Sequence, residues 1–199
     1  MFLEDSLLVN TLKTISDNRF GSSRPVYKVV PTEKEQEFAQ KCADFRSTLK
    51  SELRNLAKGY SSRDLEDEPH IQNIRDLASR LKQSYAEVLN EDELRFGVAQ
   101  KAVNMYLKYL WCANLDIRPP HCPFDYGIIA ALKLNADFEH KWTFAHEDDY
   151  REWVRLAKVA AEARGFKGFR ALSEWELWQW AEIQSREQER LNKKGIGSV

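Results

Sequence analysis

Residues 94–126, LRFGVAQKAVNMYLKYLWCANLDIRPPHCPFDY, decide how this chain folds. On a helical projection of 94–113, apolar side chains cover most of the circumference. The remaining narrow arc is polar and consists of Gly97, Gln100, Lys101, Asn104 and Lys108. A helix this apolar is normally buried on most sides, so we predict a central helix at about 91–114 that the rest of the chain covers. A double proline then ends it.

Amphipathic segments flank the central helix on both sides. Apolar residues recur at spacings of four and three from Phe38 to Leu56, which indicates one long helical stripe. Further helices are predicted at about 5–16, 70–89, 126–134 and 147–164, and a last one from Ser173. Three pairs have capping-box spacing: Thr32 with Glu35, Asn90 with Glu93, and Ser173 with Glu176. We therefore predict an all-α fold, an irregular orthogonal bundle of about seven helices without a substantial sheet.

The length of 199 residues is sufficient for one domain with a proper core. We predict a single helical domain over residues 1–192. Residues 1–31 would be an N-terminal helix and a connector, in which VYKVV (26–30) is a short extended piece. The composition of 193–199 is typical of a disordered tail.

The composition narrows the class of protein. Apolar residues make up 43% and charged residues 31%, which is typical of a globular chain. The net charge is −1, so attraction to DNA would need a local cluster of Lys and Arg. Three cysteines without a CxxC motif favour free thiols in a reducing compartment. With no signal peptide or membrane span in the pattern, we expect a cytoplasmic protein without a membrane partner and without a cofactor.

The polar arc of the central helix has two interpretations. It is either a solvent-facing stripe, or Lys101, Asn104 and Lys108 line the floor of a cleft. A lysine in an apolar surround has a lowered pKa, which suits a nucleophile or a base. Gly97 costs the helix about 1 kcal/mol relative to alanine. A glycine is tolerated at a position where a backbone or a phosphate must come close. Alternatively, the helix proper begins at Gly97.

The order of residues here resembles a reduced form of the helix-hairpin-helix DNA glycosylase signature. GVAQK at 97–101 stands where that family has a glycine-rich hairpin, and PFD at 123–125 stands where it has a P-x-D element. The resemblance implies that Gly97 and Val98 contact DNA phosphate, that Lys101 attacks the sugar C1′ carbon, and that Asp125 is the catalytic carboxylate. Ala99 replaces the second glycine, and the gap between Lys101 and Asp125 is longer than usual. From the residues alone, Asp125 is a helix N-cap.

A second likeness covers more of the chain. AQKAVNMYLKYLW, PPHCPFD and SEWELW are similar to segments of a family of uncharacterised prokaryotic and phage proteins. This resemblance implies no known activity.

Two further groups of residues are candidates for binding. The turn RGFKGFR at 164–170 places Arg164, Lys167 and Arg170 near a helix N-terminus, where they could hold a phosphate while a phenylalanine stacks on a base. Alternatively its phenylalanines plug the core. A zinc site could be assembled from His121, His140 and His146, but their spacing matches no ligand motif, so we predict no metal.

These features leave three hypotheses about function. The first is a DNA-binding protein or repair enzyme of glycosylase or lyase type, with Asn104 and Lys108 beside the catalytic pair. The second is a non-enzymatic interaction module that binds a protein partner or itself through exposed aromatics, including one of Trp175, Trp178 and Trp180. The third and least favoured is a metal-dependent hydrolase. The sequence alone leaves open whether the protein is an enzyme.

Overall fold

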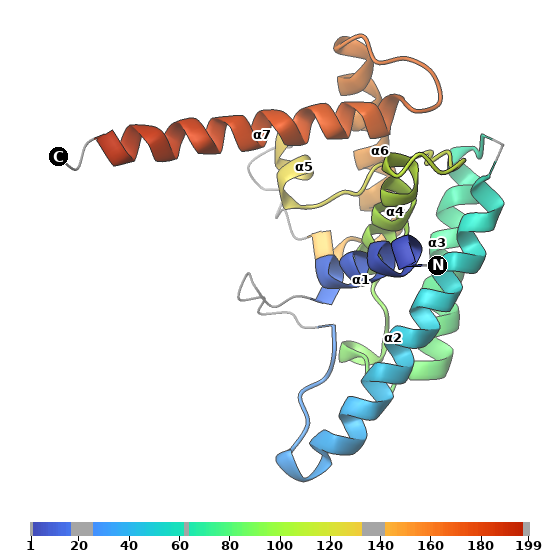
Figure 1. Ribbon diagram of the computed structural model, residues 1–199. Coiled ribbons are helices and arrows are strands. Elements are labelled where there is room, and N and C mark those ends of the chain that lie inside the picture. Colours follow the sequence, from blue (N-terminus) through green and yellow to red (C-terminus); the bar gives the residue numbers. More distant parts are fainter. Residues whose placement is uncertain (1, 17–25, 62–63, 133–141, 197–199) are drawn as a thin grey trace.

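The structure, a computed structural model, describes residues 2–16, 26–61, 64–132 and 142–196 (Figure 1). The α-helices of these segments are α1 (Phe2–Ser16), α2 (Glu35–Ala57), α3 (Asp67–Tyr85), α4 (Phe96–Cys112), α5 (Tyr126–Ala131), α6 (Glu147–Ala163) and α7 (Ala171–Ile196). Short 3-10 turns are η2 (Thr32–Lys34), η3 (Lys58–Tyr60), η4 (Asn90–Asp92) and η5 (Trp142–Phe144). The only β pairing within these segments is two isolated bridges. The predicted all-α bundle of about seven helices is confirmed.

Helix α4 lies at the centre, and α1, α2, α3 and α6 all pack against it (Figure 1). Its apolar side is buried along its length, at Val98, Ala99, Ala102, Val103, Tyr106, Leu107 and Leu110. The helix begins at Phe96, later than predicted, because Glu91 and Asp92 adopt positive φ angles of 58° and 59° that interrupt a helix. Asn90 therefore opens a separate 3-10 turn, and the capping box predicted with Glu93 is wrong.

The stripe predicted on α2 is confirmed, with Cys42, Phe45, Leu49 and Leu53 buried. The capping box at Thr32 is wrong, because Thr32 opens η2 and no side chain caps η2 or α2.

Within residues 26–30, the predicted extended piece, Tyr27 forms an isolated antiparallel bridge with Leu89. The Lys28 amide donates to the Val88 carbonyl at 3.0 Å, and the Asn90 amide donates to the Val26 carbonyl at 2.9 Å. The connector is thereby tied to the chain between α3 and α4.

The double proline is followed by an aspartate cap and then by the C-terminal helices. Asp125 Oδ1 accepts a hydrogen bond from the Ile128 amide at 3.2 Å, so its predicted role as N-cap of α5 is confirmed. The capping box of Ser173 with Glu176 is wrong, because α7 already begins at Ala171. The Ser173 hydroxyl instead donates to the carbonyls of Pro119 and His121, at 3.5 and 3.4 Å, and so ties α7 to the proline loop.

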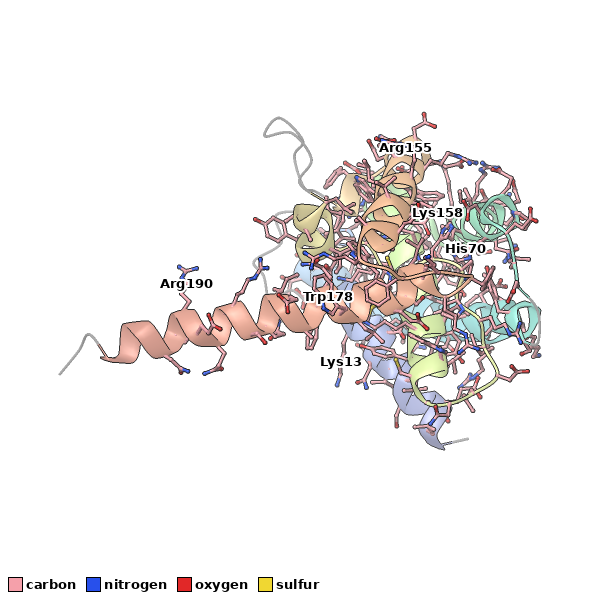
Figure 2. All side chains as sticks on the ribbon, turned by 90° about the horizontal axis from the view of Figure 1, so that it is seen from above. Lys13, His70, Arg155, Lys158, Trp178 and Arg190 are labelled. Atoms are coloured by element: carbon pink, nitrogen blue, oxygen red, sulfur yellow. The ribbon has the colours of Figure 1, made fainter. Side chains whose placement is uncertain are left out.

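The distal half of α7 projects away from the helical body (Figures 1 and 2). Arg190 lies on this projecting part, whereas Trp178 lies near the body. The helix continues to Ile196, beyond the predicted domain end at 192, and residues 197–199 lie outside the described residues. None of the helices in the described segments has the length and hydrophobicity needed to span a bilayer.

Candidate functional site

Lys101 and Asp125 meet between α4 and α5. Lys101 Nζ lies 3.4 Å from Asp125 Oδ2. The side chains are 11% and 35% exposed, so the amine is largely removed from water while the carboxylate reaches it. The Trp142 ring lies over the amine, with its centroid 4.4 Å from Nζ. Burial lowers the pKa of Lys101, and the Asp125 carboxylate opposes that shift. The sequence-predicted pair is thus brought together.

The position of Asp125 is fixed from two sides. Its Oδ1 caps α5, which leaves Oδ2 directed at Lys101. On the other side, the fully buried Gln100 binds the peptide units of Phe124 at two points. Gln100 Nε2 donates to the Phe124 carbonyl at 2.7 Å, and the Phe124 amide donates to Gln100 Oε1 at 3.3 Å. These two hydrogen bonds hold Phe124 against Gln100, the residues that precede Asp125 and Lys101.

Gly97 is required by a close approach of protein backbone. A Cβ atom placed on Gly97 would lie 1.8 Å from the Trp142 carbonyl oxygen. The Gly97 amide donates to the Ala145 carbonyl at 3.1 Å, and the Val98 amide donates to the Arg95 carbonyl at 3.0 Å. Both amides that the resemblance assigns to DNA phosphate are therefore used inside the protein. What Gly97 accommodates here is the segment that carries Trp142.

Lys108 forms a second buried ion pair on the same face of α4. Its Nζ lies 2.6 Å from Glu176 Oε2 of α7, and the side chains are 12% and 4% exposed. Burial raises the pKa of Glu176, and Lys108 opposes that shift. Because Lys108 follows Lys101 by two helical turns, the two pairs lie one above the other. Their four charges sum to zero.

Asn104 lies on this face too, but it belongs to a buried hydrogen-bond network rather than to a surface. Its Oδ1 is 2.9 Å from His70 Nε2, and its Nδ2 donates to the Tyr150 hydroxyl at 3.0 Å and to Gln100 Oε1 at 3.2 Å. Since Oδ1 can only accept, His70 Nε2 donates, and His70 Nδ1 accepts from the Tyr60 hydroxyl at 2.7 Å. Asn104 is fully buried, which places it out of reach of nucleic acid in this structure.

The network continues from Tyr150 to the protein surface. The Tyr150 hydroxyl lies 2.7 Å from His121 Nδ1, and His121 Nε2 lies 3.0 Å from Asp67 Oδ1. Asp67 in turn pairs with Lys158. Burial lowers the pKa of both His70 and His121, so both imidazoles are neutral at pH 7. The hydrogen bond from His121 lowers the pKa of Asp67, which is ionised.

This network also bears on the metal hypothesis. Both ring nitrogens of His121 have protein partners. His146 is the N-cap residue of α6, and its backbone amide donates to Asp149 Oδ2 at 2.8 Å. His140 lies outside the described residues. Within the part of the chain that the structure describes, no group of three or more His, Cys, Asp or Glu side chains is arranged to hold a metal ion.

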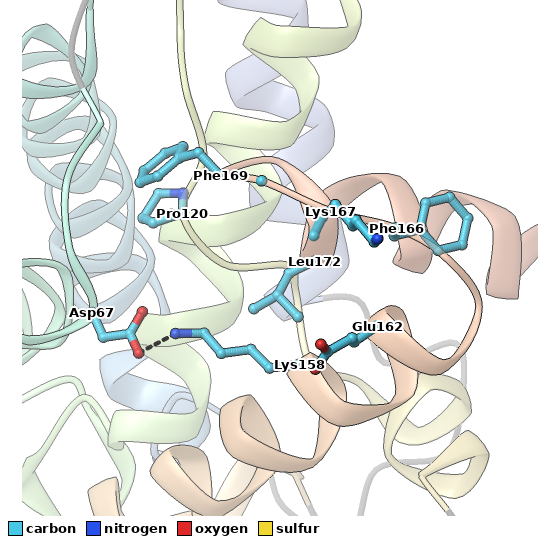
Figure 3. A pocket seen from close by; sticks show the side chains of 10 residues that line it. Asp67, Pro120, Lys158, Glu162, Phe166, Lys167, Phe169 and Leu172 are labelled. Carbon is cyan, nitrogen blue, oxygen red and sulfur yellow. Dashed lines mark hydrogen bonds and ion pairs between the residues drawn. The ribbon is translucent and has the colours of Figure 1, made fainter.

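The turn at 164–170 borders a cavity of about 470 Å³ (Figure 3). Its lining includes two cations and two carboxylates: Lys158, Lys167, Asp67 and Glu162. These charges balance, and Lys158 is already paired with Asp67, so the cavity has no net attraction for phosphate.

The side chains of the turn differ in their surroundings. The Arg164 guanidinium lies over the Trp178 ring at 4.3 Å, and Phe166 packs against the same ring at 6.4 Å. Lys167 and Arg170 are exposed. Phe166 thus follows the core-packing alternative, while the two remaining cations face water far in sequence from Lys101.

Several partners of the polar arc do not follow from the sequence pattern. Glu176, Trp142, His70 and Tyr150 all reach α4 from distant segments, and Gln100 was placed on the arc without a role. The signal for such partners was the burial of the helix itself, since polar groups inside a core need hydrogen-bond partners. Burial predicts that such partners exist, but it does not identify the residues that provide them.

Comparison with models of protein families, with curated proteins and with solved structures gives no match to this chain.

Proposed function

We propose that the protein is an enzyme that forms a Schiff base between Lys101 and a sugar aldehyde, and that its substrate is an abasic site in DNA. The observation that carries this proposal is the 3.4 Å approach of Lys101 Nζ to Asp125 Oδ2 in a largely buried setting. The resemblance of GVAQK and PFD to the glycosylase signature supports the choice of substrate.

The chemistry follows from the two side chains. Asp125 takes a proton from the Lys101 ammonium, and the freed lone pair on Nζ attacks the C1′ carbon of the aldehyde. The carbonyl π electrons move to oxygen, which gains the second nitrogen proton, and a carbinolamine forms. Asp125 then returns its proton to this hydroxyl, and the C–O bond breaks with loss of water. The product is a protonated imine on Lys101, with the Asp125 carboxylate restored to stabilise the positive charge.

Strand cleavage needs one further step. A base removes a proton from C2′, and its electrons form a double bond to C3′ as the C3′–O bond breaks. The 3′ phosphate leaves with that electron pair. The iminium withdraws electrons from C2′, which makes this proton removable near neutral pH.

The test is reductive trapping on DNA that contains an abasic site. Borohydride reduces the imine to a stable amine, so the wild-type protein should cross-link to the DNA. Lys101→Gln should abolish the cross-link, whereas Lys82→Gln, which changes an exposed lysine on α3, should leave it intact. Peptide mapping of the wild-type adduct should locate the DNA on Lys101, which gives a second measurement that does not depend on any variant. A wild-type protein that forms no cross-link would refute the proposal.

A second candidate function is favoured by α7. The distal half of α7 projects from the body. Along the helix, Trp180 and Leu191 have exposed fractions of 51% and 57%. This is the surface expected of a module that associates with itself or with a protein partner. Sedimentation equilibrium of the wild type and of Trp180→Ser tests self-association, and a strict monomer at all concentrations would count against it.

A further inference from the structure

We propose that Lys108 and Glu176 each change how much of Lys101 is an uncharged amine, and that their pairing keeps these two effects in balance. Lys108 favours the amine and Glu176 favours the ammonium, so the two act on Lys101 in opposite directions. This regulation matters for chemistry only if the proposed function holds, because that reaction needs the amine. It can nevertheless be measured on the protein alone.

The geometry limits which groups act on Lys101. Lys108 is the second cation on the same face of α4, Asp125 lies at the start of α5, and Glu176 belongs to α7. Among the described residues, these are the charged groups that act most strongly on Lys101. The η5 turn contributes the Trp142 ring, which is uncharged but favours a cation beneath it.

Distance and burial make these influences large enough to measure. Seven residues of helix separate the two lysines along α4 by roughly 10 Å, given a rise of 1.5 Å per residue. At that distance, a unit charge in a partly buried site changes the ratio of amine to ammonium by about tenfold. In the intact pair the effects of Lys108 and Glu176 largely cancel. Removal of one partner should expose the effect of the other.

Stability gives no separate reason for this pair. A buried ion pair is often no better for folding than two well-packed apolar side chains, because both ions lose their hydration. The side chains of the Lys108–Glu176 pair are 12% and 4% exposed, and Lys108 lies on the same face of α4 as Lys101. The charged pair differs from an apolar one in that loss of either partner would change the charge state of the neighbouring amine.

The experiment is competitive acetylation of lysines on the folded protein at several pH values, with peptide mass spectrometry. Acetic anhydride reacts with the uncharged amine, and the exposed Lys82 serves as the internal standard. Below the pKa of Lys101, Glu176→Gln should raise its relative rate about tenfold, because Lys108 is left unopposed. Lys108→Met should lower it by a similar factor. The double variant Lys108→Met/Glu176→Leu, in which no charge is left unpaired, should resemble the wild type.

The opposite signs make the proposal refutable. Near-UV circular dichroism establishes that each variant is folded, and if one single variant fails to fold, the other is compared with the double variant. Single variants that shift Lys101 in the same direction, or a folded single variant without a shift, would overturn the proposal. Because no DNA is present, this result is independent of the trapping experiment. A failure to cross-link would refute the proposed function and leave the electrostatic coupling standing.

Discussion

Replacement of Gly97 by alanine should destabilise the protein, although the same change stabilises most helices. In an unobstructed helix, glycine to alanine gains about 1 kcal/mol. At Gly97 the added carbon would lie 1.8 Å from the Trp142 carbonyl oxygen and 3.0 Å from the Trp142 carbonyl carbon. Both atoms belong to the backbone, so a rotamer change cannot relieve the overlap. Forced separation of packed elements costs about 1–3 kcal/mol and sometimes more. We expect a net loss of about 2 kcal/mol, which lowers Tm by roughly 4–8 °C for a chain of this size.

Gly127 provides a matched control. Gly127 lies in helix α5, and a carbon added there would lie 3.5 Å from Ile183 Cδ1 of α7 and 3.6 Å from Asp125 Oδ1, which are ordinary van der Waals distances. Gly127→Ala should therefore leave the free energy of unfolding unchanged or raise it by up to about 1 kcal/mol. Urea denaturation of the two variants beside the wild type measures both effects. A Gly97→Ala protein as stable as Gly127→Ala would refute the close approach of η5 to α4.

Three further perturbations test the surroundings of the site. Trp142→Leu should speed acetylation of Lys101 severalfold, since it removes both the cover over the amine and a ring that favours the ammonium; an unchanged rate would show that the ring does not shield it. Asn104→Leu should lower the free energy of unfolding by about 2–4 kcal/mol, because His70 loses its buried acceptor. A negligible change in urea denaturation would contradict this hydrogen bond between His70 and Asn104. Folding lowers the pKa values of His70 and His121, so at acidic pH the unfolded chain binds more protons than the folded protein does. Their stabilising contribution is complete above about pH 6.5 and declines below it. The urea concentration at the unfolding midpoint should therefore be lower at pH 5.5 than at pH 7.5. Equal midpoints at the two pH values would contradict buried neutral imidazoles.

The fold was largely predictable because it follows from local patterns. Helical spacing between Phe38 and Leu56 defined α2, and the double proline with Asp125 defined the break before α5. The capping boxes failed for a physical reason. A Thr, Asn or Ser three residues before Glu has the correct local chemistry, but Ser173 and Glu176 bind more favourable distant partners. Tertiary contacts therefore override a motif whose own contribution is only about 1 kcal/mol.

The candidate site was predictable only in part. The pairing of Lys101 with Asp125 was a prediction, and the structure places the two in contact. The rest of the polar arc was expected to face solvent or a cleft, whereas Asn104 is buried and Lys108 is 12% exposed, with partners from α3, α6 and α7. No spacing rule connects residues so far apart in the chain. The sequence therefore indicated an amine and a carboxylate, but not the groups that control them.

The shape of α7 separates two kinds of vulnerability along a single helix. Its first turns carry Trp175 and Glu176, which are buried, so opening them would expose the charged cluster. From Gln184 to Asn192 every side chain is exposed, and fraying there breaks hydrogen bonds without uncovering any core. A protease could therefore remove the distal turns while the start of α7, beside Lys108, stays folded. The far end of this helix is free to vary in length, whereas its beginning is as constrained as the core.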